Sequence, residues 1–161
     1  MGKEIERKFL VTGEFKHLAV KKIRITQGYL SIDPARIIRL RVSGNRAILS
    51  VKSPLNDTGF SRKEWEFEIP VPAAREILEV CLPGRIEKTR YIIPSGRHNF
   101  EVDLFHRKNR GLCIAEIELS DEDEVFENLI GWERRLQGNL NFTMSTFYNG
   151  SDAYLHQSTF E

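Results

Sequence analysis

The N-terminal segment carries charged side chains at a spacing that can do chemistry. It reads Glu4-Ile5-Glu6-Arg7-Lys8-Phe9-Leu10-Val11. In a β-strand successive side chains alternate between two faces, so Glu4, Glu6 and Lys8 share one face while apolar residues lie on the other. Carboxylates are hard oxygen ligands for divalent cations, and an ammonium group binds anionic oxygens. This strand therefore predicts a site for a metal ion and a highly charged ligand.

The same alternation recurs in most of the later strands that the sequence predicts. The charged positions on the polar faces are Arg39 and Arg41, Lys52, Arg62 with Glu64, Glu66 and Glu68, Lys88 and Arg90, Glu101 and Asp103, and Glu116 and Glu118. Clustered Arg and Lys bind phosphate oxygens, and Arg can do so through two parallel hydrogen bonds. Carboxylates and cations together fit a polyphosphate that is bound with Mg²⁺ or Mn²⁺.

The elements that must position these residues are short strands separated by turn residues. Besides the first segment, the pattern predicts strands over 24–31, 37–43, 46–52, 62–69, 85–93, 99–105 and 112–119. Amphipathic helices are expected over 72–82 and 121–130, and a weaker helical pattern covers 151–156. Residues 12–23 read as a turn with at most a short helix. The sequence thus predicts about eight strands arranged largely as hairpins.

Two architectures satisfy a charged face on so many strands. In a flat sheet the charged faces meet solvent, whereas in a closed barrel they line the bore. A plain solvent face would also carry Thr, Ser, Gln and Asn, and eight strands are enough for closure. A charged bore must be wet and occupied, because removing ions from water costs several kcal/mol for each ion unless it is paired or bound. We therefore expect an α+β fold: an eight-stranded antiparallel closed β-barrel, or tunnel, with a charged bore and helices packed outside.

Composition limits the classes of function. The chain has 161 residues, which suits a single domain over 1–161. Its 24 Lys and Arg nearly balance 23 Asp and Glu, so the net charge of +1 gives no reason to expect nucleic-acid or membrane binding. There is no long apolar run and no hydrophobic signal segment. We expect a cytoplasmic protein.

These residues resemble the CYTH family, the triphosphate tunnel metalloenzymes, over roughly residues 2–135. The motifs that carry the resemblance are Glu4 to Val11, Gln27-Gly28-Tyr29-Leu30, Arg39-Leu40-Arg41, Lys52, Arg62-Lys63-Glu64-Trp65-Glu66, Lys88-Thr89-Arg90-Tyr91, Glu101-Val102-Asp103-Leu104-Phe105 and Ala115-Glu116-Ile117-Glu118-Leu119. The resemblance implies an eight-stranded tunnel that binds triphosphate with a divalent metal.

The resemblance also implies roles for individual residues. Glu4, Glu6, Glu116 and Glu118 look like metal ligands, with Asp103 and Glu66 as further candidates. The residues that look like the phosphate-binding set are Lys8, Arg39, Arg41, Lys52, Arg62, Lys88 and Arg90. Lys88, Lys52 and Arg90 are the expected catalytic side chains. Lys88 is chosen to activate the attacking water, since a lysine among cations can have a lowered pKa.

The short form of the chain is similar to stand-alone members that hydrolyse inorganic triphosphate, and this is the predicted activity. Alternatives are a nucleoside triphosphatase, a thiamine triphosphatase, a class IV adenylate cyclase or a non-catalytic sensor that binds polyphosphate. The substrate is thus inorganic triphosphate or an organic triphosphate, and a homodimer is allowed. The chain differs from the family pattern after Glu133, where Arg134-Arg135 stands in place of Val-Thr.

Overall fold

The fold is described from a computed structural model. It describes residues 5–54, 62–121, 123–127 and 132–135, with the backbone alone for Ile5, Glu6, Pro54, Arg62 and Trp132–Arg135. The expected helical segment at 151–156 lies outside the described residues.

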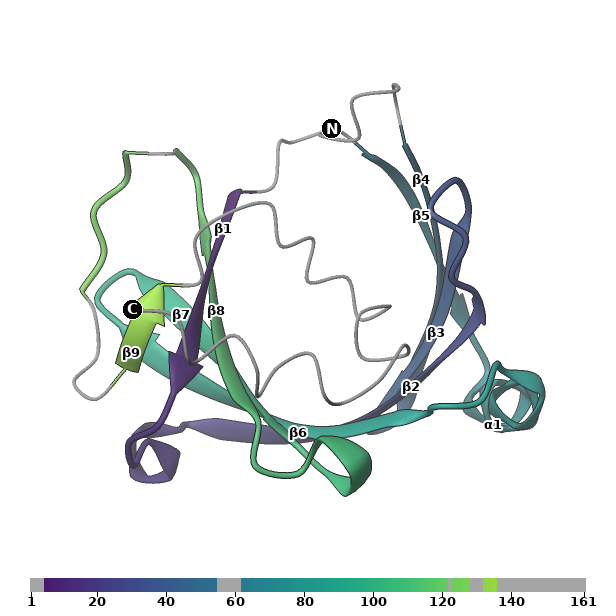
Figure 1. Ribbon diagram of the computed structural model, residues 1–161, viewed down its shortest axis with the longest axis horizontal. Helices are drawn as coiled ribbons and strands as arrows, with labels where there is room; N and C mark the ends of the chain where they lie inside the picture. Colours follow the sequence, from purple (N-terminus) through teal and green to yellow (C-terminus); the bar gives the residue numbers. More distant parts are fainter. Residues whose placement is uncertain (1–4, 55–61, 122, 128–131, 136–161) are drawn as a thin grey trace, which may run out of the picture.

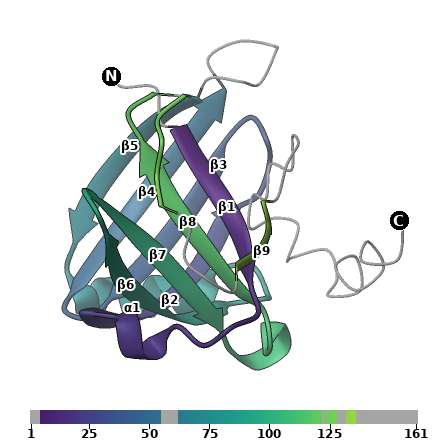
Figure 2. The ribbon, with the colours of Figure 1, turned by 90° about the vertical axis from the view of Figure 1, so that its left-hand side faces the viewer.

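Antiparallel strands dominate the structure and form one curved sheet (Figure 1). The strands are β1 (Ile5–Val11), β2 (Lys21–Ser31), β3 (Ile37–Ser43), β4 (Arg46–Pro54), β5 (Arg62–Ile69), β6 (Ile86–Ser95), β7 (His98–Phe105), β8 (Cys113–Leu119) and β9 (Trp132–Arg135). Their order across the sheet is β5-β4-β3-β2-β6-β7-β8-β1-β9. Seen from the side, β6, β7, β8 and β1 form one wall of the sheet (Figure 2). The predicted strands are all present, and β9 is an additional one.

The expectation of a closed barrel is wrong. β5 and β9 end the sheet, and within the described residues no hydrogen-bonded register joins β1 to β5. Closure requires the first and last strands to pair, but Phe9, Leu10 and Val11 on the outer edge of β1 pair with β9 instead. The result is an open trough in which β1 and β5 lie on opposite walls (Figure 1).

One α-helix is present in the described part of the chain, and it lies outside the trough. α1 (Val71–Val80) links β5 to β6, and Pro72 lies in its first turn, where a missing N–H costs nothing. Ala74 and Leu78 bury their side chains against Leu40 of β3 and Ala47 of β4. In addition, the 3₁₀ helices η1 (Lys16–Leu18) and η2 (Arg107–Asn109) lie in connections between strands. No described helix is long and apolar enough to span a membrane.

The helix expected over 121–130 is wrong for the residues described there, 121 and 123–127, which are not helical. The Glu124 side chain accepts a hydrogen bond from the Ser120 backbone N–H at 2.5 Å and lies 3.0 Å from Nε2 of His98. Phe126 makes edge-to-face contacts with Phe9 and Phe100. These contacts with β1 and β7 hold the segment against the sheet in an irregular conformation.

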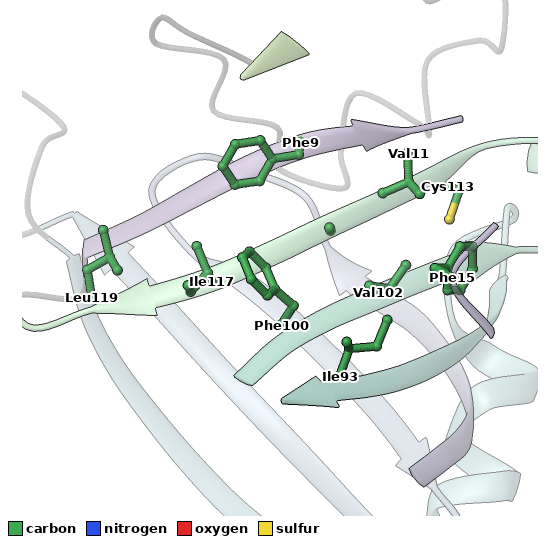
Figure 3. Close-up of a cluster of buried hydrophobic side chains, with 10 residues drawn as sticks. Phe9, Val11, Phe15, Ile93, Phe100, Val102, Cys113, Ile117 and Leu119 are labelled. Atoms are coloured by element: carbon green, nitrogen blue, oxygen red, sulfur yellow. The ribbon is translucent and has the colours of Figure 1, made fainter. Parts of the chain in front are cut away.

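Apolar side chains pack on both faces of the sheet. On the convex face, residues of β1, β6, β7 and β8 form the main core together with Phe15 (Figure 3). A second cluster consists of Tyr29, Ile37, Ile86, Phe105 and Ile114. By alternation these five residues lie on the same face as the charged residues. This inner cluster fills part of the trough with apolar side chains.

Candidate functional site

The charged alternation lies on the concave face of the sheet. α1 is outside the trough and contacts Leu40, so Arg39 and Arg41 on either side of it point into the trough. The Phe15 ring packs edge-to-face on Tyr91 on the convex side, which directs Arg90 inward as well. The strand register, and not any single motif, therefore gathers these cations on one surface.

The most buried charged groups of the site are a carboxylate and a lysine, and the carboxylate is shared by two cations. Asp103 Oδ2 accepts a hydrogen bond from Lys88 Nζ at 2.5 Å, and Arg90 binds both carboxylate oxygens at 2.7 and 2.8 Å. The side chains of Lys88 and Asp103 are only 4% exposed. Lys88 Nζ also lies 5.6 Å from the centre of the Phe105 ring. β6 and β7 thus hold this triad against Phe105 of the inner cluster.

Burial and charge shift the protonation of the triad. Burial raises the pKa of Asp103, but hydrogen bonds from Arg90 and the charge of Lys88 outweigh it, so the pKa of Asp103 lies below its usual value. Burial lowers the pKa of Lys88, and the positive charge of Arg90 lowers it further against the opposing effect of Asp103. One carboxylate faces two cations, so Lys88 is the member of the triad that loses a proton most readily.

A second group of charged side chains lies beside the triad, with carboxylates on β7 and β8 and Lys8 on β1. Glu116 Oε1 accepts a hydrogen bond from Lys8 Nζ at 2.5 Å, and Glu116 Oε2 lies 3.5 Å from Arg90. Glu101 is opposite Glu116 in the register and also binds Arg90. Arg90 therefore contacts three carboxylates and joins the triad to the wall formed by β8 and β1.

The opposite wall, on β3, β4 and β5, carries a separate set of ion pairs. Lys52 Nζ lies 3.0 Å from Glu64 Oε2, and Arg39 lies 3.7 Å from Glu64. Arg39 donates to the Ser50 hydroxyl at 3.4 Å, and that hydroxyl donates to Glu66 at 3.2 Å. The Arg39-Ser50-Glu66 row follows the register directly. Arg62 lies in β5, but its side chain is outside the described part.

Arg39 and Arg41 lack a full set of hydrogen-bond acceptors within the described residues. The Nε atoms of both are buried and have no partner there. Burial lowers the pKa of Arg41, and the nearby charges of Arg39 and Arg90 lower it further. Buried donors without acceptors are costly, and like charges repel. This part of the trough is chemically suited to a bound anion with several acceptor oxygens.

The predicted metal ligands are divided between described and undescribed positions. Glu116 and the exposed Glu118 lie on one face of β8, and Glu6 is opposite Glu118 in the register. The side chain of Glu6 and all of Glu4 lie outside the described residues. Among the residues that are described, no group of three or more His, Cys, Asp or Glu forms a metal cluster. Glu66 lies on β5 and Asp103 within the triad.

Several residues of the site were not among the predicted candidates. Glu101 and Glu64 follow the same alternation as Asp103 and Glu66, so their position in the strand was the available signal. Ser50 and Gln27 are almost fully buried on the concave face. The amide oxygen of Gln27 has no partner among the described residues. Neither residue is charged, so the alternation of charged residues in the sequence does not point to them.

Comparison with known proteins is consistent with this geometry. The CYTH domain matches residues 2–146. An inorganic triphosphatase of Acetivibrio thermocellus is 46% identical over 128 residues, which cover 79% of this chain and 81% of that protein. An inorganic triphosphatase of Nitrosomonas europaea is 36% identical over 74% of this chain and 78% of its own length. A crystal structure of an inorganic triphosphatase has a TM-score of 0.68 and 27% identity, covering 88% of this chain and 91% of that one.

Proposed function

The chain belongs to the CYTH family, and from that premise we propose that it hydrolyses inorganic triphosphate with the help of a divalent cation. The carrying observation is the group of buried cations on the concave face, where Arg39 and Arg41 have Nε donors without acceptors among the described residues. A chain of linked phosphates offers many acceptor oxygens and a high negative charge. Two relatives that are inorganic triphosphatases support this substrate.

In this proposal cations from both walls of the trough bind the phosphate chain. The substrate-binding residues are Lys8, Arg39, Arg41, Lys52, Arg62, Lys88 and Arg90. Arg39 and Lys52 already contact Glu64, and Lys8 contacts Glu116. These carboxylates hold the cations in place when no ligand is bound. The triphosphate oxygens then complete the hydrogen bonding of Arg39 and Arg41.

The carboxylates near β1 and β8 have the chemistry to hold Mg²⁺ or Mn²⁺. We assign this role to Glu4, Glu6, Glu116 and Glu118, with Glu66 and Asp103 as further candidates. Their hard oxygens suit either ion. The register that sets Glu6 opposite Glu118 supports the assignment. When bound, such a cation polarises phosphoryl oxygens and offsets the negative charge of the substrate.

Lys88, Arg90 and Lys52 are the proposed catalytic residues. The depressed pKa of Lys88 allows its neutral amine to accept a proton from the attacking water, while Asp103 keeps that amine in position. Arg90 and Lys52 bind phosphate oxygens and stabilise the negative charge that develops on the leaving pyrophosphate. The water attacks the terminal phosphorus in line with the bond that breaks.

Other properties complete the proposal. The domain extends over 1–161, and we place the protein in the cytoplasm without nucleic-acid or membrane partners, in keeping with its net charge of +1. The proposed function is also compatible with a homodimer. A nucleoside or thiamine triphosphatase and a class IV adenylate cyclase must in addition recognise an organic group, and no motif of the chain suggests an adenine pocket.

The deciding experiment separates an enzyme from a non-catalytic polyphosphate sensor. Purified protein is incubated with inorganic triphosphate and Mg²⁺ or Mn²⁺, and phosphate release is measured over time. We expect multiple turnovers with either cation and none after chelation. Tight binding of triphosphate by calorimetry without any phosphate release would identify the sensor instead.

A further inference from the structure

A group of arginines lies on the convex side of the sheet, away from the trough. We call Arg24, Arg107 and Arg110, with Glu87 and His106, the outer arginine cluster. These five residues line an open depression of about 480 Å³. Glu87 precedes the inward-pointing Lys88 and so points outward. η2, which contains Arg107, lies beyond β6 on the convex side (Figure 1).

Glu87 positions two of the guanidinium groups. Its Oε2 accepts a hydrogen bond from Arg24 at 3.1 Å, and its Oε1 accepts one from Arg107 Nε at 3.0 Å. Burial opposes ionisation of Glu87, but Arg24 and Arg107 outweigh it and lower its pKa. The carboxylate therefore stays charged and aligns cations from two distant parts of the chain.

His106 fixes the connection between β7 and β8 to β6, the strand that contains Glu87. Its backbone N–H donates to the Glu87 carbonyl at 2.9 Å, and its Nε2 lies 2.8 Å from the Thr89 hydroxyl. The next residue, Arg107, has a left-handed backbone with φ of 56°, which is strained for a side chain as large as arginine. This connection directs Arg107 toward Glu87 despite that strain.

Positive charge exceeds negative charge in the outer arginine cluster. Three guanidinium groups face one carboxylate, which leaves a formal surplus of two positive charges when His106 is neutral. Arg110 forms no ion pair with the described residues. A guanidinium group has five N–H donors, and Glu87 uses one from Arg24 and one from Arg107. The cluster thus has both the charge and the donors to bind an anion.

We propose that the outer arginine cluster is a second anion site that binds a phosphate dianion, either free or as the end group of a small phosphate ester. Two negative charges match the surplus, and arginine forks suit the oxygens of a phosphate group. The cluster is exposed, so binding weakens as salt concentration rises. This site is independent of the proposed hydrolysis in the trough.

An amide NMR titration tests the proposal on the full chain. Inorganic phosphate is added to labelled protein, and in a second arm glycerol 3-phosphate is added. We expect saturating shifts for the amides of Arg107, Lys108 and Asn109. Saturation by the ester as well as by phosphate would show that an end group is accepted, whereas saturation by phosphate alone would restrict the site to the free ion.

Variants separate this site from phosphate binding in the trough. Arg110→Gln breaks no described ion pair, and we expect it to weaken the binding followed at the η2 amides about tenfold. Arg107→Gln combined with Arg110→Gln should abolish that binding while shifts at Arg39 and Arg41 remain. Arg46→Gln is the matched control, because Arg46 is exposed and paired with Glu68 at 2.9 Å elsewhere on the sheet. The proposal is overturned if phosphate causes no saturating shifts at the η2 amides of the parent protein. It is also overturned if the double variant shows the same saturating shifts as the parent.

Discussion

Asp103 is the most buried carboxylate among the described residues of the candidate site. Its side chain is 4% exposed and contacts Lys88 and Arg90 through both carboxylate oxygens. A buried ion pair adds little stability relative to apolar residues, but removing one partner leaves an uncompensated buried charge. Asp103 is therefore needed for stability because it compensates the charges of two buried cations.

Asp103→Asn is expected to lower the free energy of unfolding at neutral pH by about 3 to 5 kcal/mol. The folded-state pKa of Asp103 lies below its ordinary value of 3.8. The carboxylate of Asp103 therefore stabilises the fold fully above its ordinary pKa of 3.8, and this stabilisation is lost as the pH falls through the folded-state pKa. Urea unfolding at a series of pH values should show parent and variant converging in acid.

The control for this variant is Asp33→Asn. Asp33 is partly exposed and lies 2.8 Å from Arg36, so its loss should cost at most about 1 kcal/mol. A difference between Asp103→Asn and the parent that stays constant into strong acid would contradict the role given to the carboxylate.

Arg41→Met tests whether the cations of the trough are arranged for a ligand. Burial and repulsion by Arg39 and Arg90 disfavour the charged guanidinium of Arg41, so we expect the thermal midpoint of the ligand-free protein to stay the same or rise. Triphosphate affinity should fall about tenfold or more, because a charge-assisted hydrogen-bond donor is lost. Differential scanning fluorimetry with and without triphosphate measures both effects.

Arg46→Met is the matched control for that experiment, since Arg46 is an exposed arginine paired with Glu68. It should leave triphosphate affinity unchanged. A large drop in the ligand-free midpoint of Arg41→Met would instead indicate a structural ion-pair role for Arg41.

Lys88→Arg separates a base from a simple positive charge. Arginine keeps the charge but cannot lose a proton at ordinary pH. We expect kcat to fall about a hundredfold or more while KM changes little. In the parent protein kcat should rise with pH as Lys88 loses its proton, and this rise should be absent from the variant. Equal pH profiles of kcat for parent and variant would assign the activation of water to another group.

At the scale of single elements, alternation in the sequence was enough to find the strands. The strands expected over 37–43 and 62–69 match β3 and β5, because apolar and charged residues alternate over 38–42 and over 64–69. β2 begins three residues earlier than expected, at Lys21. β9 was not predicted because Glu133-Arg134-Arg135 has no apolar face, and its pairing with β1 is a long-range contact.

The helix expected over 121–130 shows where local pattern fails. Its residues have helical periodicity, but Glu124 and Phe126 find partners on distant strands. Glu124 lies 2.8 Å from Arg97 as well as close to His98, and Phe126 packs on Phe100 of β7. Tertiary contacts of this kind override intrinsic propensity, and a single sequence does not reveal them.

Gly28 of β2 lies close to the C-terminal end of α1. A Cβ atom at this position would lie 2.9 Å from both Cβ and Sγ of Cys81, just after the helix. Gly28→Ala should therefore lower the free energy of unfolding by about 1 to 3 kcal/mol, because α1 must move away from β2. Chemical denaturation measures the loss.

Adding Cys81→Ala to Gly28→Ala removes Sγ and should restore part of the stability. Cys81→Ala alone serves as the reference. Identical losses with and without the sulfur atom would show that the contact with Sγ of Cys81 does not limit the approach of the helix.

For the whole molecule, sequence reasoning found the charged surface but not the shape of the sheet. Strand number and alternation are compatible with closure, yet closure depends on whether the first and last strands pair. β9 occupies part of the edge of β1 that such pairing needs. The inner cluster of Tyr29, Ile37, Ile86, Phe105 and Ile114 was likewise unexpected, because most of its residues stand next to other apolar residues in the sequence and so do not mark one face.

The identities of the ion pairs could be predicted only in part. Alternation placed Lys88, Arg90 and Asp103 on one face, but the partner of each depends on the register between β6 and β7. That register sets Arg90 opposite Asp103, and Lys88 reaches the same carboxylate diagonally. The net charge of +1 therefore does not reveal that charged side chains of both signs gather on the concave face.

Substrate specificity depends on how the cations are arranged on the concave face, and it is the most demanding test of the proposed function. The described cations of the trough lie on both walls, Arg39 and Lys52 on one and Arg90 and Lys8 on the other, and in the proposed function a chain of three phosphates contacts both sets. A nucleoside adds bulk without matching charges. Inorganic triphosphate should therefore have a higher kcat/KM than ATP, and pyrophosphate should bind but turn over poorly because it is too short to contact both walls. Initial rates on the three compounds at fixed Mg²⁺ measure this order. Conversion of ATP to cyclic AMP and pyrophosphate faster than triphosphate is cleaved would identify the protein as a cyclase.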